Sequence, residues 1–187
     1  MDFSNVKAIA VNIDVDEERL TQELESIPKF LWDSGEDSKT ETYWNTIWLT
    51  KNNIGKFDDF KTAKTITHDE WSWNEDLDIP YIRSLVSSLP IKNIGMIRAF
   101  ILDGPLPMHV DTNETTPKDM SYSMGLTIAS KLEQPMSMQG DILVEDKNVF
   151  FNDSIPHGFP TASGKQISIR IFGEFDYYGF SVRKVYQ

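Results

Sequence analysis

The chain has 187 residues, no cysteine and a formal net charge of −11. This length suits one domain, residues 1–187, whose hydrophobic core needs no disulfide support. The acidic balance disfavours general binding of nucleic acid, because phosphate backbones are repelled. The absence of cysteine excludes disulfides and thiolate ligands, and it agrees with the reducing cytoplasm in which we expect the protein.

The hydropathy pattern predicts neither a signal peptide nor a membrane-spanning helix. Residues 1–15 alternate polar and apolar side chains and lack the apolar run of a signal peptide. No stretch approaches the roughly 20 apolar residues of a membrane helix. We therefore expect no membrane partner.

The first half of the chain predicts a mixed α/β support region over residues 1–93. Apolar and polar spacing predicts strands over 7–13 and 46–50 and helices over 16–27 and 79–89. The polar, turn-rich stretch 51–76 predicts loops.

From residue 94 the pattern changes to short strands separated by turn residues. We expect strands over 96–102, 121–130, 136–145, 149–152 and 166–175. Regular short strands of this kind favour a β-sandwich or jelly roll. The sequence thus predicts a mainly β (α+β) fold, with a β-core over 94–180 and the N-terminal helices packed on its outside.

Three residues of the second half form a candidate metal-binding set. His109 and Asp111 are two residues apart, so in an extended chain both side chains face one side. His157 follows several strands later. Two imidazoles and a carboxylate are the facial triad of non-haem iron sites, which leaves three positions of an octahedral ion open.

Arg170 is the candidate for binding a carboxylate of a ligand. It follows His157 by thirteen residues in the apolar strand pattern Ile167-Ser168-Ile169-Arg170-Ile171, and a charge in such a strand requires a partner. A guanidinium offers a planar, two-pronged match to a carboxylate. Strand parity places Ser168 on the Arg170 face, where its hydroxyl can bind the same carboxylate.

Small polar residues of the preceding strand also suit an interior that holds a ligand. By parity Ser121, Ser123, Gly125 and Thr127 share one face. We include Ser123 with Ser168 and Arg170 as the residues that contact the ligand.

The H-x-D pair, the distal histidine and the arginine on the next strand resemble the iron(II)/2-oxoglutarate-dependent oxygenases. The stretch NDSIPHGFPTASGKQISIRIFGEF carries most of this resemblance, which covers roughly residues 94–176. The family's fold is a double-stranded β-helix, a cupin-like jelly roll. The resemblance implies that His109, Asp111 and His157 bind Fe(II), and that Arg170 binds the far carboxylate of 2-oxoglutarate.

Within that family the chain is somewhat similar to the aspartyl/asparaginyl β-hydroxylase branch. The similarity lies in Phe150-Phe151-Asn152-Asp153-Ser154 before His157 and in Met124-Gly125-Leu126. The branch usually has Arg-x-His where this chain has Ser121 and Ser123, and it often lacks an acidic ligand such as Asp111.

The activity that the resemblance implies is hydroxylation of a C–H bond in an amino-acid, peptide or small-metabolite substrate, coupled to oxidation of 2-oxoglutarate by dioxygen. Two alternatives stay open. One is a cupin-like metalloenzyme that uses no oxo acid, in which Arg170 is structural. The other is a non-catalytic jelly-roll module whose aromatic residues bind the ligand. The sequence does not indicate an oligomeric state.

The remaining histidine and the tryptophans have simpler interpretations. His68 lies in a polar stretch and is expected to be solvated. All five tryptophans lie in the first half, at positions 32, 44, 48, 71 and 73. We expect them to pack between helices and sheet, with a substrate mouth or lid as the alternative.

Overall fold

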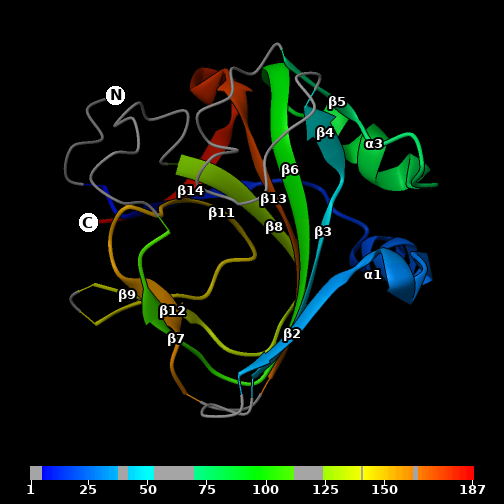
Figure 1. Cartoon of the computed structure of the whole chain (residues 1–187). Coiled ribbons are helices and arrows are strands. Elements are labelled where there is room, and N and C mark those ends of the chain that lie inside the picture. The colour runs from blue at the N-terminus through cyan, green and yellow to red at the C-terminus, as the bar shows by residue number, and fades with distance from the viewer. Residues whose placement is uncertain (1–5, 38–41, 53–69, 112–123, 140, 162–163) are drawn as a thin grey trace.

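The computed structural model of the chain describes residues 6–37, 42–52, 70–111, 124–139, 141–161 and 164–187. Its fold is mainly β, built from antiparallel sheets (Figure 1). The larger sheet has eight strands in the order β14-β1-β11-β8-β13-β6-β3-β2, and a smaller sheet has four in the order β10-β9-β12-β7. Among the described residues no helix has the length and apolar character needed to span a membrane.

The strands of the larger sheet are, in that order, Ser181–Tyr186, Ala8–Asn12, Asn148–Asn152, Met124–Leu132, Lys165–Phe175, Ile91–Asp103, Thr42–Trp48 and Asp33–Asp37. Those of the smaller sheet are Ile142–Val144, Met136–Met138, His157–Phe159 and Leu106–His109. A separate pair joins β4 (Thr50–Asn52) to β5 (Trp71–Trp73).

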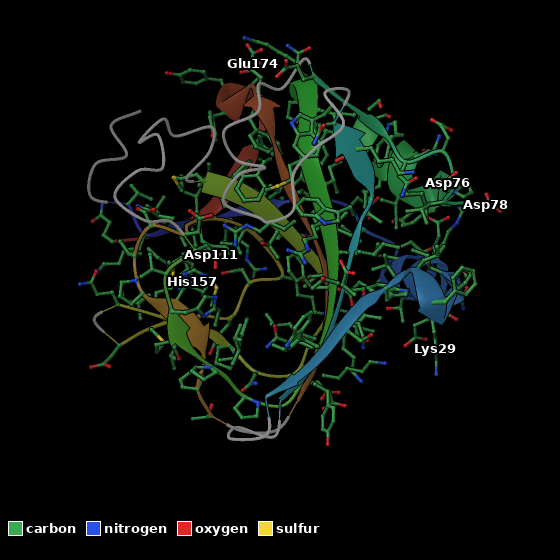
Figure 2. The ribbon with its side chains drawn as sticks, viewed as in Figure 1. Lys29, Asp76, Asp78, Asp111, His157 and Glu174 are labelled. Atoms are coloured by element: carbon green, nitrogen blue, oxygen red, sulfur yellow. The ribbon has the colours of Figure 1, made fainter. Side chains whose placement is uncertain are left out.

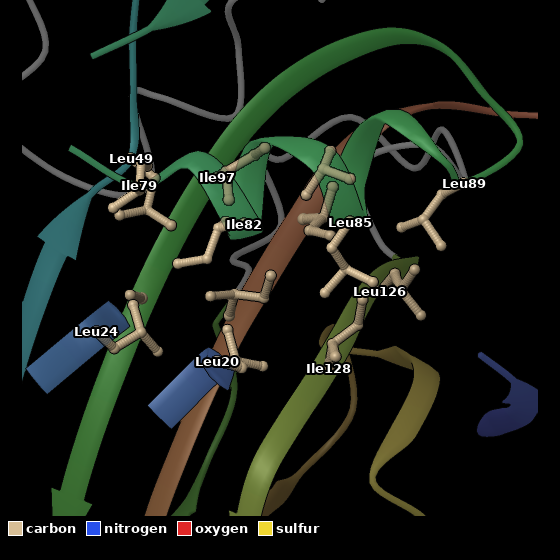
Figure 3. Close-up of a cluster of buried hydrophobic side chains, with 14 of the residues drawn as sticks. Leu20, Leu24, Leu49, Ile79, Ile82, Leu85, Leu89, Ile97, Leu126 and Ile128 are labelled. Carbon is tan, nitrogen blue, oxygen red and sulfur yellow. The ribbon is translucent and has the colours of Figure 1, made fainter. Parts of the chain in front are cut away.

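Helices α1 (Glu17–Ser26) and α3 (Pro80–Ser87) cover the face of the larger sheet that points away from the smaller one (Figure 1). Asp16 begins α1, because its carboxylate accepts a hydrogen bond from the backbone N–H of Arg19 at 3.0 Å. Leu20 and Leu24 of this helix are fully buried. Figure 3 shows them packed with side chains of α3 and of the sheet. The prediction that N-terminal helices pack outside one sheet is confirmed.

Strand β13 separates this core from the space between the sheets. Ile167, Ile169 and Ile171 are almost fully buried in the core shared with the helices. Ser168 and Arg170 alternate with them and line a cavity on the opposite face. The predicted parity of these two residues is therefore confirmed, and β13 places them toward the smaller sheet.

Several predicted elements differ in detail. The stretch expected to be loop contains β4 and β5, which pair with each other. The single strand expected over 136–145 is two strands, β9 and β10, because the chain turns at Asp141, whose φ is 60°. The larger sheet also includes β1, β2 and β3 from the first half, next to strands of the expected β-core. The strand patterns gave no residue ranges for β7 and β12, although His157 was expected on a strand facing the strand end that carries His109 and Asp111.

Candidate metal centre

Pairing of two short strands brings the candidate metal ligands together. His109 is the last residue of β7 and His157 the first of β12, and the two are direct partners in the antiparallel register. Asp111 follows β7 by two residues, and its backbone N–H donates to the carbonyl of Asp153 at 3.1 Å. Figure 2 shows Asp111 and His157 close together on the side of the smaller sheet.

The three side chains converge on one point. The distance from His109 Nε2 to Asp111 Oδ1 is 3.2 Å, and that from His157 Nε2 to Asp111 Oδ2 is 3.6 Å. One donor atom of each residue lies within 4.8 Å of the others. Two imidazole nitrogens and a carboxylate oxygen at this separation could hold a metal ion, and the set predicted from the sequence is the one that the structure assembles.

Both histidines have the ring orientation that metal binding requires. His109 Nδ1 lies 2.9 Å from the carbonyl oxygen of Pro107, and His157 Nδ1 lies 3.0 Å from that of Ile155. Each Nδ1 therefore donates a hydrogen bond to a carbonyl, so the neutral ring would present the Nε2 lone pair to an ion in place of the N–H that faces Asp111. In both histidines the acceptor is the carbonyl two residues upstream, and this hydrogen bond fixes the ring against rotation.

The charges around Asp111 favour its ionised form. Burial alone raises the pKa of this carboxyl, but hydrogen bonds with His109 and His157 and the charge of Arg170 more than offset it. The pKa of Asp111 therefore lies well below its ordinary value. The hydrogen bond to Asp111 raises the pKa of His109, against the opposing effect of burial. A metal ion would thus meet a carboxylate that is already charged.

Arg170 lies directly behind the triad. Its side chain is 6% exposed, and its Nη1 is 3.9 Å from Asp111 Oδ2. Nη2 donates to Oδ2 of Asp153 at 3.2 Å. The guanidinium carbon also lies 3.7 Å from the ring centroid of Phe151 and 5.0 Å from that of Phe172. Burial lowers the pKa of Arg170, and the carboxylates of Asp153 and Asp111 oppose this shift.

Asp153 joins the parts of this site and was not predicted as a functional residue. It is fully buried. Its carbonyl oxygen fixes the backbone of Asp111, and its carboxylate fixes Arg170. In the sequence Asp153 contributes only to the resemblance, because a carboxylate in a turn is usually solvated and nothing local indicates its burial.

Gly125 on β8 makes room for the arginine. A Cβ at this position would lie 2.8 Å from the ring of Phe172 and 2.9 Å from Arg170 Nε. Any larger residue would displace one of these side chains. The shared face predicted for Gly125 and Thr127 is thus the face that packs on the site, and Thr127 lines the cavity.

The cavity beside the triad has a volume of about 360 Å³. The larger sheet contributes polar side chains to its wall, including Thr46, Arg98 and Ser168, and the smaller sheet contributes apolar ones, including Leu106 and Phe159. Such a combination of apolar walls and few polar groups is typical of small-ligand sites. Three residues discussed from the sequence, His68, Ser121 and Ser123, lie outside the described residues.

The tryptophans divide between the two interpretations offered for them. Trp32 and Trp73 pack against the core under the helices, as expected. Trp44 lines the cavity and is 37% exposed, which fits the alternative of a substrate mouth. Trp48 stacks on Trp71 with ring centroids 6.3 Å apart.

Arg98 of β6 is a second cation that sequence reasoning missed. It lines the cavity and is the register partner of Arg170 on the neighbouring strand. Its Nη2 donates to Thr46 Oγ1 at 2.5 Å, and its guanidinium carbon lies 4.8 Å from the ring centroid of Trp48. Arg98 could have been predicted in the same way as Arg170, because it is also a charged residue within an apolar strand pattern, here residues 94–102.

The chain matches no protein-family model and no curated protein.

Proposed function

We propose that the protein is a non-haem iron(II), 2-oxoglutarate-dependent dioxygenase that hydroxylates a C–H bond of an amino-acid, peptide or small-metabolite substrate. Membership of the oxygenase family that the sequence resembles is part of this proposal. The observation that carries it is the convergence of His109, Asp111 and His157 next to the buried guanidinium of Arg170, at the wall of a cavity.

The strand order supports a double-stranded β-helix. Eight consecutive strands, β6 to β13, are divided four and four between the two sheets, and the first pairs with the last. Within the larger sheet their order is β11-β8-β13-β6, and within the smaller it is β10-β9-β12-β7. This is the crossing pattern of two interlocked Greek keys. In this order His109 is the last residue of the second strand, Asp111 follows that strand, and His157 begins the seventh.

The charges of the site suit an anionic ligand. Two guanidiniums, Arg98 and Arg170, interact with three carboxylates, Asp33, Asp111 and Asp153. A divalent ion added to this set would leave a charge of about +1, because the histidines bind as neutral ligands. An oxo acid would offset that positive charge, whereas a neutral ligand would not.

Each part of the site then has a task. His109, Asp111 and His157 would hold the ion, and an octahedral ion with three protein ligands would have room for an oxo acid and dioxygen. Iron bound there would supply the oxidative chemistry that converts 2-oxoglutarate to succinate and carbon dioxide and hydroxylates the substrate. Arg170 binds a carboxylate of the oxo acid through a planar, charge-assisted contact, while Asp153 and the ring of Phe151 hold the guanidinium in place.

One observation favours a second candidate, a cupin-like metalloenzyme without an oxo acid. Arg170 already has a carboxylate partner in Asp153. If that pair satisfies the arginine, its role is structural. The two candidates differ in whether the iron-loaded protein binds 2-oxoglutarate.

The test is iron-dependent formation of succinate from 2-oxoglutarate, measured with a panel of amino acids, peptides and metabolites. We expect a slow basal release that one class of substrate stimulates. His109→Ala and His157→Ala should abolish it while the circular dichroism spectrum stays unchanged. Release that is independent of iron, or that both variants retain, would refute the proposal.

A further inference from the structure

Gln166 is a buried polar residue of the cavity that neither the triad nor Arg170 explains. It is 6% exposed and lies on β13, four residues before Arg170. Its partners in the register are Leu102 of β6 and Leu132 of β8, which line the same cavity. Its Nε2 has no hydrogen-bond partner among the described residues. A buried amide donor without an acceptor is destabilising, so a side chain of this kind in a cavity wall calls for a ligand.

Position along β13 places Gln166 far from the metal. Gln166, Ser168 and Arg170 alternate with core isoleucines, so all three face the cavity in one row. Residues four apart on a strand are separated by about 13 Å. Arg170 marks the metal end of the row, since its Nη1 is 3.9 Å from Asp111 Oδ2.

Arg170 is too close to the ion to be the natural partner of the far end of the oxo acid. An ion bonded to Asp111 Oδ2 at about 2.1 Å would lie within about 6 Å of Arg170 Nη1, because that nitrogen is 3.9 Å from Oδ2. In an extended, chelated 2-oxoglutarate the far carboxyl carbon is about 7 Å from the ion by standard bond lengths. A hydrogen-bond donor to that carboxylate lies about 3 Å beyond it. The row from Arg170 through Ser168 to Gln166 lines the cavity over a distance of this size.

We propose that Gln166 is the specificity residue for the far carboxylate of the oxo acid, and that Arg170 contacts the ligand at its metal end. This inference rests on the proposed function. The amide N–H of Gln166 donates to a carboxylate oxygen, and Leu102 and Leu132 exclude water around that contact. A charge-assisted hydrogen bond in such surroundings selects an oxo acid with a second carboxylate over one that ends in a methyl group.

A second buried glutamine provides a matched control. Gln134 is 8% exposed, and its Nε2 also has no hydrogen-bond partner among the described residues. Its Oε1 accepts from Thr161 Oγ1 at 3.3 Å. Gln134 is absent from the wall of the cavity. A change there alters a buried amide of the same kind without touching the proposed ligand.

The experiment is anaerobic calorimetric titration of the iron(II)-loaded protein with 2-oxoglutarate and with 2-oxopentanoate, which lacks the far carboxylate. We expect Gln166→Met, which keeps the shape and removes the donor, to weaken 2-oxoglutarate binding roughly 10- to 100-fold and to leave 2-oxopentanoate binding unchanged. Gln166→Glu, which places a like charge against the carboxylate, should weaken 2-oxoglutarate binding further. Gln134→Met should bind both acids as the parent protein does.

The outcomes separate this inference from the proposed function. If the parent protein binds neither acid, the proposed function fails and this inference with it. If the parent prefers 2-oxoglutarate and Gln166→Met keeps that preference, the inference alone fails. Equal weakening of both acids in Gln166→Met would also overturn it, because the residue would then act on the cavity as a whole. Circular dichroism of each variant verifies that it is folded, and Gln166→Glu provides the second measurement if the methionine variant does not fold.

Discussion

The pair between Asp153 and Arg170 allows a quantitative test of how the site is held together. In Asp153→Asn the carboxylate becomes a neutral amide of nearly the same shape, and the guanidinium remains buried without its nearest counter-charge. Arginine stays protonated under all ordinary conditions, so it cannot escape by losing its charge. We therefore expect a large loss of stability from a change of only a few atoms.

The structure sets the magnitude. Removing one partner of a buried ion pair costs about 3–5 kcal/mol. Arg170 keeps the Asp111 carboxylate at 3.9 Å and the ring of Phe151, so the loss should lie at the lower end, about 3 kcal/mol. For a chain of this length each 1 kcal/mol lowers the melting temperature by about 2–4 °C. The metal-free Asp153→Asn variant should thus melt about 6–12 °C below the parent.

The assay is urea and thermal unfolding of the metal-free protein. Asp76→Asn is the control, because it breaks an ion pair with Lys51 whose two side chains are 73% and 54% exposed. It should cost less than about 1 kcal/mol. Adding Arg170→Met to Asp153→Asn removes the stranded charge and should restore part of the loss. A parent-like melting temperature for Asp153→Asn, or a double variant less stable than the single one, would refute this account of the pair.

Three further changes probe the centre. His157→Ala should lower iron(II) affinity by at least 100-fold in anaerobic titration, because it removes one of three ligands; unchanged iron content would exclude this histidine as a ligand. Gly125→Ala should weaken 2-oxoglutarate binding more than iron binding, since its Cβ meets Arg170 and Phe172. The Cβ of Gly179→Ala meets Pro90 and Asp176 instead and should affect neither, so equal effects of the two alanines would contradict this. Arg170→Lys keeps the charge and loses the planar fork, so 2-oxoglutarate affinity should fall while iron affinity changes little; unchanged affinity for the oxo acid would favour the cupin-like alternative.

Much of the metal centre could be predicted from the sequence, because its signals are local. Parity within an extended segment places His109 and Asp111 on one side and places Arg170 with Ser168. Helix α1 has a capping aspartate and regular apolar spacing, and both its existence and its packing outside the sheet were predicted.

What the sequence could not predict depends on long-range pairing. The strands β7 and β12 have four and three residues, too few for a periodic pattern, yet their register brings His109 next to His157. Asp153 follows β11 and is fully buried against Arg170 of β13, two strands away across β8. Nothing in its turn sequence indicates this burial. From the sequence Gln166 looks like an ordinary polar strand residue, because its apolar neighbours Leu102 and Leu132 come from other strands.

The central claim is that this triad is an iron(II) centre that chelates 2-oxoglutarate. The most direct test is anaerobic titration of the iron(II)-loaded protein with 2-oxoglutarate, followed by the metal-to-ligand charge-transfer absorption of the chelate. We expect one iron(II) per chain and a saturable absorption band with one equivalent of the oxo acid, and we expect Asp111→Ala to lose both. Stoichiometric iron binding without the band would leave only a metal-binding cavity, and full iron binding by Asp111→Ala would contradict the assignment of the centre itself.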